Sequence, residues 1–287
     1  MRIILWLAIS ILLNTNISIG QSVPFIFRDQ KIINSFSTAT LPARTLDFRI
    51  SHRFGDMFGN TGGWKAFYGL ENARDISIGF DYGINDRLMI GINRTKGSGQ
   101  GLRMLINTYF KYKLAGQRQL VENPTAVSFV AMTSISTMPK TEGITAISNF
   151  PKFIHRFMHH FQFVVAKRFS DGISLQISTG YTHLNFVDTD DVNFLLNVGL
   201  AGRFQFSKTF ALILEGNWPI RFEDVEKNYK NPIGGGVEWE TGGGHVFQII
   251  LTNAGGLAET DYIPNTISDW GDGEFRLGFT ISRKFKL

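Results

Sequence analysis

Apolar and polar residues alternate with a period of two along most of this chain. Residues 173–182 read ISLQISTGYT, with apolar side chains at most odd positions and small or polar ones at the even positions. Successive side chains of a strand point to opposite faces, so this pattern predicts a strand with one apolar and one polar face. The same alternation recurs in residues 45–54, 76–84, 87–95, 102–114, 125–136, 157–169, 193–206, 210–220, 244–253 and 274–287, and more weakly in 234–240. It predicts about twelve strands, most of them close to the roughly 9–11 residues that cross a bilayer when tilted.

The links between these segments alternate in length. Tight, turn-rich links lie at 85–86, 170–172, 207–209 and 241–243, whereas long links lie at 55–75, 137–156, 221–233 and 254–273, with shorter ones at 96–101 and 187–192. If the first strand begins in the periplasm, every tight link is periplasmic and every long link is extracellular, apart from a periplasmic link of about ten residues at 115–124. An even strand number with short turns on one side and long loops on the other is typical of an outer-membrane β-barrel.

The composition of the two faces separates this barrel from a soluble sandwich, the alternative all-β fold. The apolar face is rich in aromatic residues, such as Phe80, Tyr82, Phe110 and Phe161, and the opposite face carries Ser, Gly, Asn, Gln, Arg and Lys. A barrel turns such an apolar face to lipid and the polar face to its lumen. We therefore expect an antiparallel up-and-down transmembrane barrel over residues 45–287. Its alternating final strand, 274–287, is expected to be read by the barrel-assembly machinery.

The first twenty residues are typical of a secretory signal peptide. Met1 and Arg2 precede an apolar run over residues 3–13, and small residues at Ser18 and Gly20 favour cleavage before Gln21. The run is too short to span a bilayer as a helix, which takes about 20 residues. We therefore expect export to the outer membrane of a Gram-negative bacterium. Residues 21–44 are expected to lie in the periplasm with a partner there, to enter the lumen, or to add a strand.

Residue types exclude several kinds of chemistry. The chain has no Cys among its 287 residues, which excludes disulfides, Cys-ligated zinc and thiol nucleophiles. No nucleotide motif or metal-ligand spacing occurs, so we expect no cofactor, no metal and no catalytic residue. The net charge of +5 does not indicate nucleic-acid binding, because the basic residues are predicted to line an interior. Acidic loop residues, among them Asp188, Glu259, Asp261 and Asp269, are expected to face solvent and lipopolysaccharide. A lipid hydrolase would need His159 beside a serine, with Ser134 or Ser148 as candidates.

Strand phase predicts which side chains line the lumen. The basic ones are Arg49, Arg53, Arg103, Lys111, Lys113, Arg168, Arg203, Arg276, Lys284 and Lys286. The acidic ones are Asp47, Asp81, Glu215, Glu238 and Glu240, and His160 and Gln162 are also predicted to point inward. The excess of basic groups favours anions in an open lumen. In a closed lumen the same groups would pair with one another. The first long loop, with Trp64, Phe67, Tyr68 and Leu70, is a candidate plug.

Several short motifs resemble a known family. They are TLDFRISHRFG at residues 45–55, FYGLENA at 67–73, DISIG at 75–79, YGINDRL at 82–88 and YFKYKL at 109–114. These stretches resemble outer-membrane β-barrel proteins of Bacteroidetes-type bacteria that are grouped as a domain of unknown function. The resemblance implies an outer-membrane location and carries no catalytic residue over to this chain.

Three functions are compatible with these observations. The first is a narrow channel or transporter for small solutes, anions among them, which rests on the basic lumen. The second is a lipid-modifying hydrolase embedded in the barrel. The third is a structural or docking barrel with a closed lumen, whose loops or residues 21–44 bind a partner.

Overall fold

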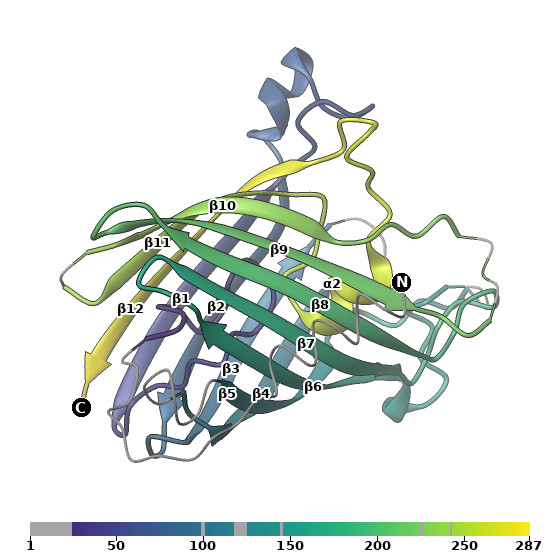
Figure 1. The fold of residues 1–287 in the computed structure, drawn as a ribbon. Helices are drawn as coiled ribbons and strands as arrows, with labels where there is room; N and C mark the ends of the chain where they lie inside the picture. Colours follow the sequence, from purple (N-terminus) through teal and green to yellow (C-terminus); the bar gives the residue numbers. More distant parts are fainter. Residues whose placement is uncertain are drawn as a thin grey trace.

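The computed structural model is a closed barrel of twelve antiparallel strands (Figure 1). It describes residues 25–287 except 99–100, 118–124, 144–145, 224, 226 and 242, so the predicted signal peptide and most of the link at 115–124 lie outside the described residues. Each strand is hydrogen-bonded to its neighbours in sequence, and the last strand closes the barrel against the first. The predicted fold class, strand number and up-and-down order are confirmed.

The strands match the alternating segments to within a few residues. They are β1 (Thr45–Phe54), β2 (Ala73–Gly83), β3 (Leu88–Gly97), β4 (Met104–Ala115), β5 (Ala126–Ser136), β6 (Phe157–Arg168), β7 (Ile173–Leu184), β8 (Phe194–Gln205), β9 (Phe210–Ile220), β10 (Ile233–Glu240), β11 (His245–Thr252) and β12 (Arg276–Lys286). The helical segments are η1 (Trp64–Gly69), η2 (Phe153–Arg156) and α2 (Glu259–Asn265).

The seam between β1 and β12 closes the sheet. Its register runs from Thr45 opposite Lys286 to Arg53 opposite Gly278. A closed sheet satisfies its backbone N–H and C=O groups between strands, which is what a strand structure needs in the hydrocarbon of a bilayer. No helix among the described residues is long and apolar enough to cross a membrane.

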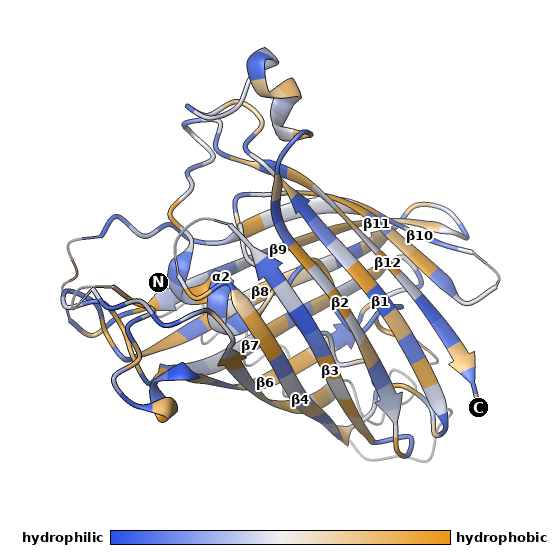
Figure 2. Ribbon diagram, turned by 180° about the vertical axis from the view of Figure 1, so that it is seen from behind, coloured by the Kyte–Doolittle hydropathy of each residue, from blue (hydrophilic) through white to orange (hydrophobic). Residues whose placement is uncertain are grey.

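Side chains alternate across the barrel wall as the sequence predicts. Outward positions carry large exposed apolar residues such as Phe80, Phe110, Phe163 and Leu200, and inward positions carry buried polar residues such as Asn107, Ser128 and Gln176. Figure 2 shows this alternation as bands of orange and blue along the strands. The outer surface therefore suits lipid, and the interior is hydrophilic.

The tight links all lie at the barrel end where β1 begins and β12 finishes, which is the periplasmic end by the usual rule for such barrels. The opposite end carries the long loops. The loop between β1 and β2, with η1, projects away from the barrel (Figure 1), and Trp64 is 74% exposed and Phe67 50% exposed. The expectation that this loop plugs the lumen is therefore wrong.

Candidate functional site: the filled lumen

The N-terminal segment, residues 25–44, folds into the barrel and is here called the plug. It reverses direction as a small hairpin, in which Lys31 and Phe36 form a bridge and the Ile32 N–H donates to the Ser35 carbonyl. Ile32, Ile33, Phe36 and Leu41 are almost completely buried. Of the three placements open to residues 21–44, the lumen is the one that the structure shows for residues 25–44.

A single carboxylate holds the turn of the hairpin. Glu215 of β9 accepts hydrogen bonds from the backbone N–H groups of Ile33, Asn34 and Ser35, at 3.0, 2.9 and 3.1 Å. Hydrogen bonds to an ionised acceptor are roughly twice as strong as neutral ones. On the other side of the turn, Arg53 of β1 donates to the Asn34 side chain at 2.8 Å and to the Ile33 carbonyl at 3.2 Å. The turn is thus fixed from two sides of the lumen wall.

The ammonium group of Lys111, on β4, holds both arms of the hairpin. Its Nζ donates to the carbonyl oxygens of Gln30, Ser37 and Ala39 at 3.1, 3.0 and 2.6 Å. The side chain is completely buried. A buried cation needs compensating oxygens. Here the plug backbone supplies these oxygens, so removal of the plug would leave Lys111 without them.

Ion pairs and hydrogen bonds tie the periplasmic part of the plug to the wall. Asp29 pairs with Arg49 of β1, which also binds Asp47 at 3.0 Å. Lys284 of β12 donates to the Arg28 carbonyl at 2.8 Å, and Arg28 pairs with Glu240 at 3.2 Å.

Apolar packing adds to these polar contacts in two places. Phe36 and Leu41 lie in a buried cluster with Met89, Tyr109 and Val130 of the wall. Phe27, Ile32 and Ile33 lie in a second cluster with wall residues of β6, β9 and β11, namely Ala166, Ile213 and Ile250.

A second element, the loop of residues 253–268 with α2, fills the extracellular half of the lumen and is here called the inner loop. Thr260 and Ser134 of β5 share a hydrogen bond of 2.6 Å between their hydroxyl groups. Glu259 is buried and forms a salt bridge of 3.0 Å with Lys31. The inner loop and the plug therefore touch each other inside the barrel.

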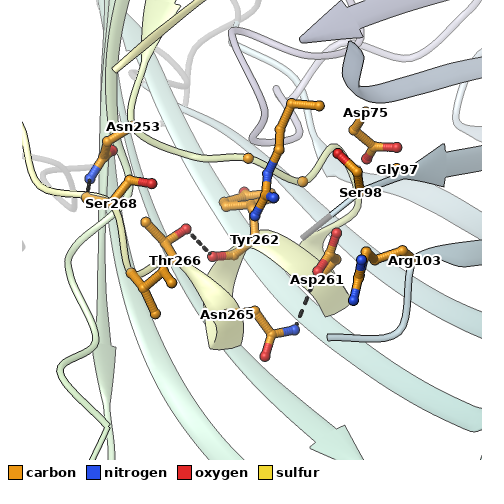
Figure 3. Close-up of a pocket in the computed structure, with 14 residues that line it drawn as sticks. Asp75, Gly97, Ser98, Arg103, Asn253, Asp261, Tyr262, Asn265, Thr266 and Ser268 are labelled. Carbon is orange, nitrogen blue, oxygen red and sulfur yellow. Dashed lines mark hydrogen bonds between the residues drawn. The ribbon is translucent and has the colours of Figure 1, made fainter. Parts of the chain in front are cut away.

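The extracellular end of the lumen is a small polar pocket between the inner loop and the starts of β2 and β4 (Figure 3). Asp75, Arg103, Asp261 and Asn265 line it, and its free volume of about 10 Å³ is no more than one water molecule needs. Burial raises the pKa of the Asp261 carboxyl to about 6, against the effects of the Asn265 amide and of Arg74 and Arg103.

Two further hollows lie along the lumen. One of about 30 Å³ lies between the plug and the inner loop, beside Lys31, Arg49 and Tyr109. The other, of about 880 Å³, opens at the periplasmic end, where Arg28, Lys113 and Lys284 line it. Between these hollows the described residues fill the lumen, so the lumen is blocked in this structure.

The residues predicted to line the lumen do lie on its inner face. Arg49, Arg53, Lys111, Arg203, Arg276, Asp47, Asp81, Glu215, Glu238, His160 and Gln162 are buried or nearly so, whereas Arg103, Lys113, Arg168, Lys284 and Glu240 are half-buried, towards the barrel ends. Lys286 is exposed at the periplasmic rim. Many of the charges are paired, as with Arg203 and Glu238 at 2.7 Å. The alternative of a paired, closed interior is the one that the structure displays.

The arrangement needed for a lipid hydrolase is not present at the predicted residues. His159 faces outward and its Nδ1 contacts the Thr133 hydroxyl at 3.0 Å. Ser134 is buried on the inner face, where it binds Asn107 and Thr260, and the Ser148 hydroxyl binds Thr141 at 2.8 Å. Neither serine is a partner of His159. Among the described residues, no group of three His, Cys, Asp or Glu could hold a metal ion.

Sequence reasoning missed the residues that fill the lumen. Asp29, Asn34 and Ser35 in the plug and Thr260 in the inner loop had no assigned role, and Glu259 was expected to be a solvated loop carboxylate but is buried. A weak signal was available, because residues 25–44 contain several apolar side chains without the regular alternation of a lipid-facing strand. Apolar residues without a lipid face need a protein surface to cover them.

Several solved structures align with this chain at low identity. The NanC porin is 9% identical with a TM-score of 0.49, covering 84% of this chain and 100% of that chain. The KdgM porin in complex with disordered oligogalacturonate is 6% identical with a TM-score of 0.48, covering 85% and 99%. An outer membrane channel from Pseudomonas putida F1 is 13% identical with a TM-score of 0.47, covering 87% and 98%.

No curated protein matches the sequence. Residues 27–285 match the family described as membrane bound beta barrel domain (DUF5777), and this range starts within the plug. The plug and the barrel therefore fall within one family domain. The chain belongs to this family of membrane-bound β-barrels.

Proposed function

We propose that this protein is a gated outer-membrane channel for small polar solutes, closed at rest by its own N-terminal plug. The observation that carries the proposal is the chemistry of the contact between plug and wall. The strongest anchors are hydrophilic groups of the wall, Glu215, Arg53 and Lys111, bound to the plug backbone. Water can replace hydrogen bonds of this kind when the plug leaves, and the cost of opening then includes exposure of the apolar plug side chains in the two buried clusters.

The preference for anions follows from the same contacts. In the closed barrel Arg53, Lys111 and Lys284 donate to oxygens of the plug. When the plug leaves, these cations face the lumen without their partners, and a cationic lumen favours anions. We therefore propose an open state with an anion preference. Export of the chain with cleavage before Gln21, assembly through strand β12 and contact with lipopolysaccharide complete the proposal.

A crosslink between plug and wall tests the gate. Because the chain has no Cys, two introduced cysteines have no other thiol within the chain to react with. Ser35→Cys with Asn217→Cys suits this purpose, since Asn217 Nδ2 lies 3.0 Å from Ser35 Oγ. Closed by a disulfide or a short thiol-specific crosslinker, the refolded full chain should carry no ionic current across a planar bilayer.

Reduction of the disulfide should restore anion-preferring openings, and the single variant Asn217→Cys should conduct under both conditions. Equal currents in the crosslinked and reduced protein would contradict a plug gate. If the folded barrel carries no current in either the crosslinked or the reduced state, the result would instead favour a docking barrel with a closed lumen. The projecting loop with Trp64 and Phe67 is the surface that such an alternative would use.

A further inference from the structure

The part of the lumen wall made by β6, β7 and β8 has a central region without charge. Its inward side chains include His160 and Gln162 of β6, Ser178 and Thr182 of β7, and Asn197 of β8. Within these three strands the charged inward positions, Arg168 and Arg203, lie at the periplasmic ends, and on the neighbouring strand β9 Glu215 lies opposite Ala201. This neutral region lies between the plug on one side and α2, which contacts β6 and β7, on the other.

Several polar atoms in this region lack a partner. Asn197 Oδ1 makes no hydrogen bond with any described residue, and His160 Nε2 and the Gln162 amide lie near each other without forming a hydrogen bond of standard geometry. All three side chains are at most 1% exposed. A buried polar group without a partner destabilises the protein, and native structures satisfy nearly all such groups with protein or water.

The three side chains converge on one point. The strand register sets Gln162 opposite Gly180 and Gly180 opposite Asn197, so the two amides flank a residue without a side chain. A Cβ atom at Gly180 would lie 2.4 Å from Asn197 Oδ1 and 2.8 Å from His160 Cε1. The side chains of His160 and Asn197 therefore occupy the space next to Gly180. Together with Gln162 they offer both hydrogen-bond donors and hydrogen-bond acceptors.

We infer that His160, Gln162 and Asn197 form a binding site for an uncharged, hydroxyl-bearing solute such as a polyol or sugar. Hydroxyl groups both donate and accept, which matches the unpartnered atoms of these three side chains. An ion would find no counter-charge among them. This inference rests on the proposed channel, because the site opens to the lumen only when the plug moves.

The plug is connected to this site by hydrogen bonds. Asn197 Nδ2 donates to Asn217 Oδ1 at 3.4 Å, and Asn217 Nδ2 donates to Ser35 Oγ in the plug turn at 3.0 Å. A solute that also accepts a hydrogen bond from Asn197 Nδ2 competes with the chain of contacts that ends at the plug. Departure of the plug and occupation of the site are therefore linked.

Block of the ionic current by sorbitol tests the site. The full chain is placed in a planar bilayer in KCl, and sorbitol is titrated against wild type, Gln162→Met, and the control Gln205→Met at the periplasmic end of β8. We expect Gln162→Met to raise the half-blocking concentration at least tenfold and Gln205→Met to leave it unchanged. Gluconate, which differs from sorbitol chiefly by its carboxylate, should block less well than sorbitol through this site.

Equal half-blocking concentrations in wild type and Gln162→Met would overturn the inferred site, even if the KCl current itself supports the channel. If no current flows in any variant, ion conduction fails, and heat unfolding then tests whether the plug still moves far enough to admit sorbitol to the site. Sorbitol stabilises proteins in general, so the informative quantity is the difference between variants. A larger rise of the midpoint in wild type than in Gln162→Met would support the site, and equal rises would refute it.

Discussion

The two sides of the lumen wall differ in what they do with the plug. The strands β9 to β12 and β1 to β4 supply charged groups, and these bind the plug through Glu215, Arg53 and Lys111. Apart from a contact of 3.4 Å from Arg168 to the Phe25 carbonyl at the periplasmic end, the strands β5 to β8 bind it through neutral groups, with Ser128 donating to the Thr38 carbonyl and Gln176 to the Phe36 carbonyl. One barrel thus has a side that anchors the plug chiefly through charged groups and a side that binds it chiefly through neutral groups. Buried polar atoms without a partner occur on both sides, for example Asp81 Oδ2 and Gln162 Oε1.

This difference bears on how the barrel can open. Charge-assisted hydrogen bonds are stronger than neutral ones, so the charged side sets the stability of the closed state. The neutral side retains hydrogen-bonding capacity for something other than the plug. Substitutions on the two sides should therefore have different consequences, which can be ranked.

Glu215→Ala should have the largest effect on the closed state. It removes the acceptor of three backbone N–H groups and leaves Asp75 as the one remaining carboxylate that acts on Arg53 among the described residues. Leaving such groups buried without their partner costs about 3 kcal/mol. We expect trypsin cleavage after Lys31 in the folded barrel to become about 100-fold faster, because cleavage follows the population of released plug.

The control for this variant is Glu240→Ala. Glu240 pairs with Arg28 of the same plug, but both side chains are about 30% exposed, at 31% and 27%. An exposed ion pair contributes at most about 1 kcal/mol. If Glu240→Ala accelerates cleavage as much as Glu215→Ala does, anchoring is not concentrated in the buried turn of the plug.

Lys111→Met should have the next largest effect. The substitution keeps most of the side-chain volume but removes the donor to three plug carbonyls. We expect a loss of about 2 kcal/mol in plug binding, since hydrogen bonds to charged groups contribute ~1.5–3 kcal/mol each and water can enter in their place. Lys113→Met, two residues along the same strand at the periplasmic hollow, should leave cleavage after Lys31 nearly unchanged. Similar cleavage rates in Lys111→Met and Lys113→Met would contradict the assignment of Lys111 as an anchor of the plug.

The wall of the barrel was predictable from the sequence, but its contents were not. Strand phase assigns each inward residue because the period of two is strict, so Arg53, Lys111 and Glu215 were placed correctly on the inner face. Their partners belong to residues 25–44, where no periodicity indicates a position. The pairing of a buried charge with a backbone carbonyl or N–H leaves no mark in the sequence.

The first loop illustrates the opposite error. Trp64 and Phe67 indicated a plug through their apolar character, yet they are exposed. The carboxylates of the inner loop predict a solvent-facing loop, yet Glu259 and Asp261 are buried. Composition alone fails here because burial of a loop depends on whether the lumen offers partners, as Lys31 does for Glu259.

Mild acid should strengthen the docking of the inner loop inside the lumen. Burial raises the pKa of Asp261 to about 6, above the ordinary value near ~3.9. The docked inner loop therefore binds a proton more tightly than the released one, and docking strengthens as the pH falls from 7 through 6, with no further gain below about 4. Between pH 7 and pH 5 the gain is about 1 kcal/mol.

Thiol labelling measures this gain. Thr260→Cys places a buried thiol on the inner loop itself, and Ser170→Cys in an exposed turn gives the reference for the pH dependence of the reaction itself. The normalised labelling rate of Thr260→Cys should be about fivefold lower at pH 5 than at pH 7. In the double variant Thr260→Cys with Asp261→Asn the normalised rate should be independent of pH. A labelling rate that rises in acid would contradict the prediction that docking strengthens as the pH falls.

Gln176→Met should have the smallest effect, because the neutral side holds the plug with ordinary hydrogen bonds. Its Nε2 donates to the Phe36 carbonyl at 2.8 Å, and its Oε1 has no partner among the described residues. Removal of one neutral bond costs about 1 kcal/mol, and the loss of an unpartnered buried oxygen offsets part of this. Cleavage after Lys31 should rise less than fivefold, with Gln205→Met unchanged. A rise as large as that of Lys111→Met would mean that the neutral side anchors the plug as firmly as the charged side, and the division of the wall into an anchoring side and a solute-binding side would not hold.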